Sequence, residues 1–335
     1  MKKGWKRSTQ VIVPNDQTLS DMLHSFLRDR GITGVEPIGG GLSNSNIKLS
    51  LTDGDDVVLR IYNAGGTKGP IEKRILERVQ SNLPVPEVLY HDFTLSQIEY
   101  PFLVLNWVEG FQLSELFNEG DHDKLSDAGQ EVGKWLAEMH SIQFSAPGFF
   151  DEELNVKEFL TLGADSFRSV LGDIIGEGYV EENIGSEMVE EVRRFADERA
   201  YLLNRIGEQR SLVHSDFNPL NILVKTVGEG VEVTGILDWE FSFCHSPLHD
   251  IGNLLRYEDV ENSPFLRPFI SSYLKHGGEL PAEWLQQAKM MDMIALCDLV
   301  SKKGCEETRL RDIQSLFRKT FREWELYAEL QENIR

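Results

Sequence analysis

A polar segment between two apolar runs carries the residues with the clearest chemical potential in this chain. It reads His-Ser-Asp-Phe-Asn-Pro-Leu-Asn and extends from His214 to Asn221. Asp216 and Asn221 stand five residues apart on one loop, and an apolar run anchors each end, so both side chains can point into one cavity. Phosphoryl transfer needs a carboxylate near the attacking hydroxyl and an oxygen ligand for the Mg²⁺ on the phosphates. Asp216 and Asn221 are therefore candidate catalytic residues, with Asp216 at the acceptor hydroxyl and Asn221 at the metal.

A second carboxylate follows closely along the chain. Asp238 directly follows the apolar run 235–237, 17 residues after Asn221, and a hairpin through 228–230 is expected between them. A carboxylate at the end of an apolar strand is placed to hold a hard cation through its oxygens. Two magnesium-type ligands on neighbouring strands are far more specific than either alone. The sequence therefore predicts that Asn221 and Asp238 share one Mg²⁺ ion.

The elements that must position these residues fall into two parts. The first part mixes helical and alternating patterns, which predict helices at 16–30 and 70–80 and strands at 47–50, 56–62 and 100–108. The second part is mainly helical, with helices expected at 125–141, 186–206 and 281–331 and short strands at 211–213, 222–224 and 231–237. We therefore predict an α+β protein with an N-terminal lobe at 1–105, a hinge at 106–110 and a C-terminal lobe at 111–335.

These motifs resemble those of the aminoglycoside phosphotransferase and choline kinase superfamily, which shares the protein-kinase-like fold. The family's catalytic loop matches 214–221 and its metal-binding strand matches 236–240, and the resemblance covers roughly residues 20–300. It implies two lobes, a small one with an antiparallel sheet that binds nucleotide and a larger, mostly helical one for catalysis and acceptor binding. It also implies that Asp250 braces the catalytic loop through hydrogen bonds, with His214 as a second structural support.

The same resemblance assigns nucleotide-binding roles in the first lobe. The family's phosphate-covering loop matches a glycine-rich segment, and glycines there let backbone N–H groups approach phosphate oxygens. The strand that bears the phosphate-binding cation matches 57–61, with Glu72 on the following helix as the partner of that cation. The strand and hinge between the lobes match 102–110, where backbone groups would meet the purine edge. The residues with these implied roles are Gly39, Gly40, Gly41, Ser43, Asn44, Arg60, Glu72, Asn106, Trp107 and Val108.

Two positions depart from the family pattern. Arg60 stands where well-characterised drug-modifying members have lysine, and an arginine holds phosphates through a planar fork rather than a point charge. Ser215 stands where the family usually has glycine, and a serine fits there if the backbone has a negative φ.

The distribution of charge separates the two parts. The formal net charge is −21, but residues 1–105 hold 12 basic and 12 acidic residues, so the whole excess lies after them. Such a surface argues against nucleic acid or an anionic membrane as a partner. The acidic second part is either a solvated surface or an acceptor-binding region for a cationic substrate.

The remaining features indicate a protein of the cytoplasm. No apolar run is long enough to cross a membrane, and no apolar segment of a signal peptide follows the basic N-terminus. Three cysteines without a Cys-x-x-Cys pair suit a reducing compartment, and each is expected to be a small buried hydrophobe.

Together these observations predict a small-molecule kinase that transfers the γ-phosphoryl group of ATP, or alternatively GTP, to a hydroxyl of a small cationic acceptor. Mg²⁺ is the expected cofactor, and the nucleotide and the acceptor are the expected partners. One alternative is a kinase for a neutral acceptor such as a macrolide or a sugar. Another is a nucleotide-binding pseudokinase that regulates a partner, although the candidate residues Asp216, Asn221 and Asp238 are intact. A protein kinase is disfavoured because no Asp-Phe-Gly or Ala-Pro-Glu segment is present.

Overall fold

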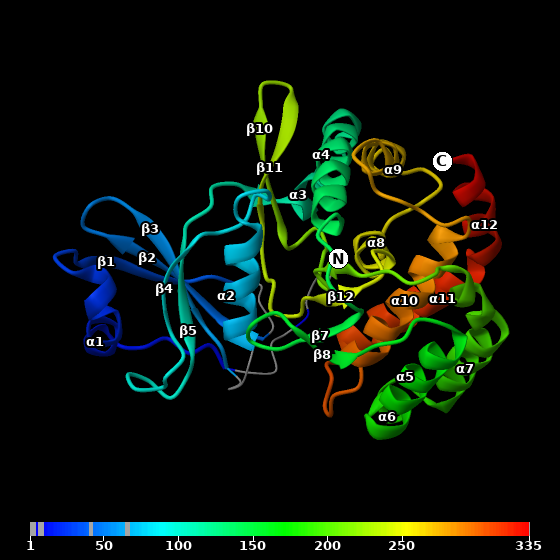
Figure 1. The fold of residues 1–335 in the computed structure, drawn as a ribbon, viewed down its shortest axis with the longest axis horizontal. Helices are drawn as coiled ribbons and strands as arrows, with labels where there is room; N and C mark the ends of the chain where they lie inside the picture. The colour runs from blue at the N-terminus through cyan, green and yellow to red at the C-terminus, as the bar shows by residue number, and fades with distance from the viewer. Residues whose placement is uncertain (1–4, 6–9, 40–42, 64–67, 335) are drawn as a thin grey trace.

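The computed structural model describes residues 5, 10–39, 43–63 and 68–334, and these residues form two lobes (Figure 1). The N-terminal lobe holds a five-stranded antiparallel sheet in the order β1-β2-β3-β5-β4. Its elements are α1 (Asp16–Leu27), β1 (Ile32–Pro37), β2 (Ser45–Leu51), β3 (Asp56–Ile61), α2 (Lys68–Val79), β4 (Val88–Asp92) and β5 (Phe102–Asn106).

Alternation along the strands places one helix on each face of this sheet. Ile47 and Leu49 of β2 pack in one buried cluster with Leu23 of α1. Leu103 of β5 lies in the other cluster, together with Ile75 of α2. Successive side chains of a strand point to opposite faces, so β5 is buried on both sides of the sheet.

The C-terminal lobe is mainly helical, with two small sheets on the side facing the first lobe (Figure 1). Its strands are β6 (Phe111–Gln112), β7 (Gly148–Phe150), β8 (Val156–Phe159), β9 (Ser211–Val213), β10 (Ile222–Val227), β11 (Gly230–Ile236) and β12 (Phe243–His245). Its helices are α3 (Leu113–Glu119), α4 (His122–His140), α5 (Ala164–Glu177), α6 (Val180–Ile184), α7 (Ser186–Arg199), η1 (Ala200–Arg205), α8 (Leu248–Leu254), α9 (Leu266–Lys275), α10 (Trp284–Leu299), α11 (Glu307–Arg322) and α12 (Trp324–Asn333).

The predicted α+β fold with an antiparallel first lobe and a helical second lobe is confirmed. The strand predicted at 211–213 is β9, but the sequence patterns missed β1, β4 and the strands β7, β8 and β12 that share its sheet, because short or half-exposed strands carry little alternation. β5 ends at Asn106 and β6 begins at Phe111, so the predicted hinge is the segment between two strands. Gly110 in that segment has φ +147°, and a Cβ there would lie 2.7 Å from the Thr234 hydroxyl.

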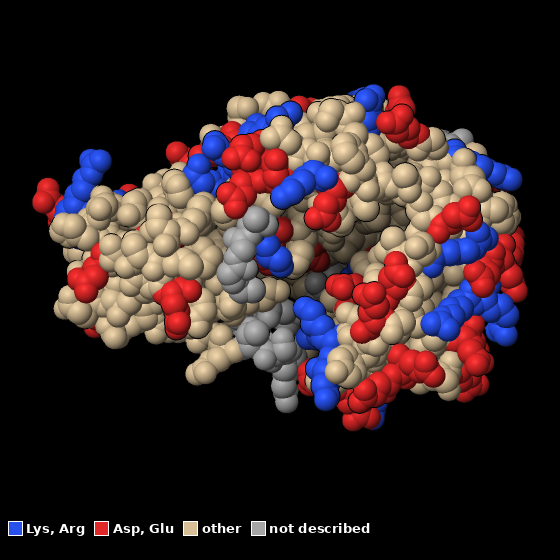
Figure 2. Space-filling model, turned by 60° about the horizontal axis from the view of Figure 1, so that its bottom comes forward, with Lys and Arg blue, Asp and Glu red and all other residues tan. Residues whose placement is uncertain are grey.

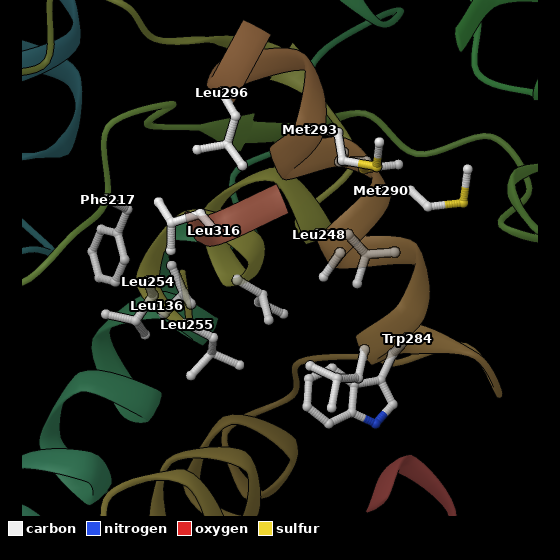
Figure 3. Packing of buried hydrophobic residues seen from close by; sticks show 14 of the residues in the cluster. Leu136, Phe217, Leu248, Leu254, Leu255, Trp284, Met290, Met293, Leu296 and Leu316 are labelled. Atoms are coloured by element: carbon white, nitrogen blue, oxygen red, sulfur yellow. The ribbon is translucent and has the colours of Figure 1, made fainter. Parts of the chain in front are cut away.

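Helix α8 is fixed in the core of the second lobe. Leu248 and Leu254 of α8 belong to one apolar cluster with Met293 and Leu296 of α10 and Phe217 of the catalytic loop (Figure 3). A Cβ at Gly252 would lie 2.3 Å from the Ala288 carbonyl oxygen, so only glycine allows α8 to approach α10 this closely. This close packing matters for function because α8 also carries Asp250.

Two other sequence expectations concern membrane-spanning segments and the cysteines. In the part of the chain that the structure describes, no helix is long and apolar enough to cross a membrane. Cys244 and Cys297 are buried and Cys305 is half-buried, and all three are free thiols.

The buried His245 and the half-buried His249 form a pair that predicts acid sensitivity. His245 Nδ1 lies 3.0 Å from His249 Nε2, and burial lowers the pKa of His245 to about 4 and that of His249 well below its usual value. Above about pH 6.5 both histidines are neutral in the folded and the unfolded chain, so they do not lower the free energy of unfolding. Between about pH 6.5 and 4 these histidines bind protons in the unfolded chain but not in the folded chain. For His245 we expect a loss of about 2 kcal/mol at about pH 5.

Urea unfolding at neutral and acidic pH measures this effect. The Glu72 carboxyl works in the opposite direction, because burial raises its pKa to about 7, so the comparison must be made between variants. His245→Gln should flatten the fall in unfolding free energy below about pH 6.5, whereas the exposed His122→Gln should keep it. Parallel profiles for both variants would exclude His245 as the source.

Candidate active site

The catalytic loop joins β9 to β10, and a hydrogen-bond network fixes its first residues. Asp250 on α8 accepts the backbone N–H of His214 at 2.8 Å and that of Ser215 at 2.8 Å. The His214 ring bonds the Leu237 carbonyl oxygen through Nε2 at 2.9 Å and the Asp216 N–H through Nδ1 at 3.2 Å. A carbonyl only accepts and an N–H only donates, so the ring is the neutral tautomer with its proton on Nε2.

A second layer holds Asp250 itself. His140 at the end of α4 places Nε2 3.2 Å from Asp250 Oδ2 and Nδ1 2.9 Å from the Tyr273 hydroxyl. Because the carboxylate accepts, the imidazole donates from Nε2, and its Nδ1 accepts a hydrogen bond from the Tyr273 hydroxyl. Asp250 has an exposed fraction of 0% and His140 one of 5%, so this chain of bonds is shielded from water.

Ser215 does not meet the condition of a negative φ, because its φ is +70°. This is the left-handed region, where a non-glycine residue costs roughly 1–2 kcal/mol. The bond from the Ser215 N–H to Asp250 holds the backbone in this conformation. Glycine would adopt it without strain, which explains why the family pattern favours glycine here.

Two asparagines orient the carboxylate of Asp216. Asn218 donates its Nδ2 to Asp216 Oδ1 at 2.7 Å, and Asn221 donates its Nδ2 to Asp216 Oδ2 at 2.8 Å. Both amides also reach the Asp216 carbonyl oxygen, at 3.0 and 2.9 Å. The carboxylate is therefore held in one orientation before any substrate binds, which is the preorganisation that positioning catalysis requires.

The strand pair β10-β11 brings Asn221 and Asp238 to neighbouring strand ends. The Leu237 N–H donates to the backbone carbonyl oxygen of Asn221 at 2.8 Å, and Asp238 follows with a left-handed φ of +73°. The side-chain nitrogen Nδ2 of Asn221 donates to Asp216, so the side-chain oxygen Oδ1 is the atom of this amide that can bind a cation. An amide oxygen and a carboxylate are hard oxygen donors, so this donor set fits Mg²⁺.

Arg60 of β3 lies among three carboxylates at the boundary between the lobes. Its Nε is 2.9 Å from Glu72 Oε2, and its Nη2 forms an ion pair with Asp238 and lies 3.7 Å from Glu240 Oε1. Glu72 also accepts the Tyr62 hydroxyl at 2.5 Å and the Trp239 N–H at 3.2 Å. These bonds connect α2 of the first lobe to the metal-binding segment of the second.

Burial and the neighbouring charges together set the pKa values in this cluster. Burial opposes the charge of Arg60, but Asp238 and Glu72 together raise its pKa well above the usual value. Burial and the nearby Asp238 charge likewise raise the pKa of Glu240. Lys68 at the start of α2 gives Glu240 a second cation, with Nζ 3.5 Å from Oε2.

The phosphate-covering loop is described only in part. Gly40 and Gly41 lie outside the described residues, whereas a Cβ on Gly39 would meet nothing within 4 Å. The Ser43 carbonyl oxygen accepts the Asn63 amide at 2.7 Å, and the buried Asn44 interacts with Glu240. The end of this loop therefore reaches the same charged cluster as Arg60.

Two of the three backbone N–H groups at the predicted hinge residues have partners within the protein. The Asn106 N–H already bonds the Glu87 carbonyl oxygen at 3.1 Å, and the Trp107 N–H bonds that of Asp56 at 3.3 Å. The Trp107 ring packs against Lys48, whose Nζ is 4.3 Å from the ring centroid. Val108 is thus the residue of the three whose amide remains a candidate for the base.

Sequence reasoning gave no role to several residues of this site. Asn218 and Glu240 lie inside the motifs, two positions after Asp216 and Asp238, and this spacing was the available signal. The bond from His140 to Asp250 links positions 110 residues apart, which no local pattern indicates. Lys68 and Tyr62 likewise carry no motif.

Similar folds occur among solved phosphotransferases. Aminoglycoside 2'-phosphotransferase IIIa, solved with GDP, has a TM-score of 0.66 at 16% identity, over 95% of this chain and 98% of that one. Aminoglycoside phosphotransferase APH(4)-Ia has a TM-score of 0.60 at 16% identity, over 96% and 98%. Macrolide 2'-phosphotransferase MphH from Brachybacterium faecium has a TM-score of 0.60 at 13% identity, over 95% and 98%.

Sequence comparison gives the family itself. A search of curated protein sequences finds no match. The model of the family described as "Phosphotransferase enzyme family" matches residues 34–285, which include the catalytic loop, Arg60 and Asp238. With most of its length matched by that model and a kinase-like site at the lobe boundary, this chain belongs to the phosphotransferase enzyme family and is a phosphotransferase.

Proposed function

We propose that this chain is a small-molecule kinase that transfers the γ-phosphoryl group of ATP or GTP to a hydroxyl of a small cationic acceptor. The observation that carries the proposal is Asp216, whose two oxygens are held by Asn218 and Asn221. A carboxylate fixed in this way can orient an acceptor hydroxyl and take its proton. The acceptor oxygen then forms a bond to the γ-phosphorus, the bond to the β–γ bridging oxygen breaks, and the nucleoside diphosphate leaves.

The other residues of the site have roles in holding the donor. Asn221 and Asp238 would hold Mg²⁺, which neutralises phosphate charge when it is bound. Arg60 would bind the α- and β-phosphates, with Glu72 positioning it. Related folds support a purine nucleotide donor, because APH(4)-Ia was solved with AMP-PNP and hygromycin B, and the 2'-phosphotransferase IIIa with GDP.

The charge of the second lobe supports a cationic acceptor. In the view of Figure 2, acidic side chains gather with fewer basic ones over the helical lobe, whereas acidic and basic residues are equal in number in residues 1–105. A cavity of about 320 Å³ also opens beside Pro219 of the catalytic loop, with Glu258, Asp259 and the Tyr257 ring in its wall. Carboxylates and an aromatic ring are suitable partners for an ammonium group.

An acceptor panel tests the proposal. Purified protein with Mg²⁺ and ATP or GTP is incubated with aminoglycosides, amino-sugars, choline, macrolides and neutral sugars, and phosphorylated products are identified by mass spectrometry. The kcat/KM for a cationic acceptor should fall steeply as salt rises, because screening weakens the attraction. A best acceptor that is neutral, with kcat/KM independent of salt, would contradict the cationic assignment. No phosphorylated product with any acceptor, alongside intact nucleotide binding, would support a pseudokinase instead.

Asp238→Ala should weaken binding of Mg²⁺–nucleotide and turnover together. The substitution removes the carboxylate that stands opposite the Asn221 amide oxygen, so the ion loses a hard oxygen ligand. Turnover measured against Mg²⁺ at fixed ATP should require a higher Mg²⁺ concentration for half-maximal rate. An unchanged metal dependence would mean that the ion is held elsewhere. Glu232→Ala, on the exposed side of β11, is the matched control.

A further inference from the structure

We propose that a groove between α7 and α11 is a second ligand site, which binds a nucleoside monophosphate. The groove has a volume of about 490 Å³, within the range of small-molecule sites. The two helices contact each other in the part of the second lobe that lies away from the first lobe (Figure 1). The residues that line the groove are Glu191, Arg194, Phe195, Glu198, Arg199, Arg318, Phe321 and Arg322. None of them takes part in the site at the lobe boundary, so this binding activity is additional to the proposed function.

The groove is basic although the lobe around it is strongly acidic. Four arginines and two glutamates line it, whereas residues 106–335 carry the whole net charge of −21. Salt at 0.1 M screens exposed charges over about 10 Å, so a ligand in the groove interacts mainly with the nearest side chains. The local excess of arginine therefore attracts an anion to this part of the lobe.

Two of these arginines lack an acidic partner among the residues that the structure describes. Arg199 pairs with Glu198, and Arg322 pairs with the glutamate that follows it. The side chains of Arg194 on α7 and Arg318 on α11 form no ion pair or hydrogen bond with a described residue. Arg318 and Arg322 also stand four positions apart on one helix, where like charges repel. A bound anion would reduce this repulsion and give both unpaired guanidiniums an acceptor.

The groove also has an aromatic wall. The ring centroids of Phe195 and Phe321 are 4.6 Å apart, and Trp324 meets Phe195 edge-on at 4.9 Å. Arg199 covers Phe195, with its guanidinium carbon 4.3 Å from the ring centroid. Phe321 is half-buried, so part of its ring remains open to a ligand. A ligand with a planar ring would bury that surface by stacking, which an inorganic anion cannot do.

The polar groups narrow the class of ligand further. One unpaired guanidinium on each helix can hold a phosphate group through bidentate hydrogen bonds. The carboxylate of Glu191 forms no ion pair within the described part of the chain, and a carboxylate accepts hydrogen bonds from hydroxyl groups. Phosphate, hydroxyl groups and a planar ring occur together in a nucleoside monophosphate. We therefore choose AMP as the probe.

Calorimetric titration with AMP in excess EDTA tests the contribution of the two arginines. Affinity should fall at least about tenfold in Arg194→Ala and in Arg318→Ala, because each variant loses a charged donor to the phosphate. Arg193→Ala and Arg311→Ala are matched controls, since each removes an exposed arginine of the same helix that does not line the groove. Their affinities should change less than about threefold. Adenosine, which lacks the phosphate, should bind to the wild type at least about tenfold more weakly than AMP.

Photolabelling distinguishes the groove from the site at the lobe boundary. Irradiation with 8-azido-AMP, followed by peptide mapping, should label peptides of α7 or α11 in the wild type and in Arg311→Ala, but not in Arg318→Ala. Far-UV circular dichroism checks that each variant is folded. Labelling confined to the lobe boundary would overturn the proposal, as would equal AMP affinities in the groove variants and their controls, or equal affinities for AMP and adenosine. Neither measurement uses turnover or metal, so a chain that proves inactive as a kinase still gives a result for the groove.

Discussion

Asp216→Asn should reduce kcat by about 10²–10⁴-fold, the usual contribution of a positioned general base. The substitution keeps the size and planarity of the side chain, so the loop between β9 and β10 should remain folded. The amide cannot take the proton of the acceptor hydroxyl. Because the role of Asp216 is toward the acceptor, affinity for Mg²⁺–nucleotide should stay close to that of the wild type.

Steady-state kinetics with an accepted substrate, together with nucleotide titration, separates the possible outcomes. Asp173→Asn removes one charge from an exposed position on α5 and should leave kcat unchanged. A fall in kcat of less than about tenfold, or roughly 1.4 kcal/mol of barrier, would remove Asp216 from the role of base. A large loss of nucleotide affinity would assign the residue to metal binding or folding instead.

Asp250→Ala should destabilise the protein by about 3 kcal/mol or more. Its carboxylate accepts the N–H groups of His214 and Ser215 and the Nε2–H of His140, and a methyl group accepts none of them. Each buried donor left without an acceptor costs about 1–3 kcal/mol. The left-handed Ser215 would lose the bond that holds it, so kcat should fall as well.

Urea unfolding and kinetics together test this prediction. Asp250→Asn keeps one acceptor oxygen, so it should lie between the wild type and Asp250→Ala in both unfolding free energy and kcat. It also serves if the alanine variant does not fold. Asp173→Ala should stay within about 0.5 kcal/mol of the wild type, as an exposed substitution usually does. If Asp250→Ala unfolds like this control, Asp250 does not brace the catalytic loop.

The two predictions differ in how far apart in the sequence the residues lie on which each one depends. The pairing of Asp216 with Asn221 could be predicted from the sequence because both lie on one short loop, where spacing alone limits the distance between them. Asp238 was likewise placed by a strand end close along the chain. The role of Asp250 came from a family resemblance, since the bond to Ser215 joins residues 35 positions apart.

The sequence by itself determined the two-part α+β organisation, the loop that presents Asp216 and Asn221, and the charge difference between the lobes. Periodicity, local spacing and composition are properties of the chain, so they can be read before it folds. Only the tertiary structure decided the left-handed backbone of Ser215 and the partners of Arg60. Arg60 and Asp238 are 178 residues apart, and they meet because the lobes pack together. Because the cluster is buried, little water screens the charges of Arg60 and its three carboxylates, so their electrostatic interactions are strong.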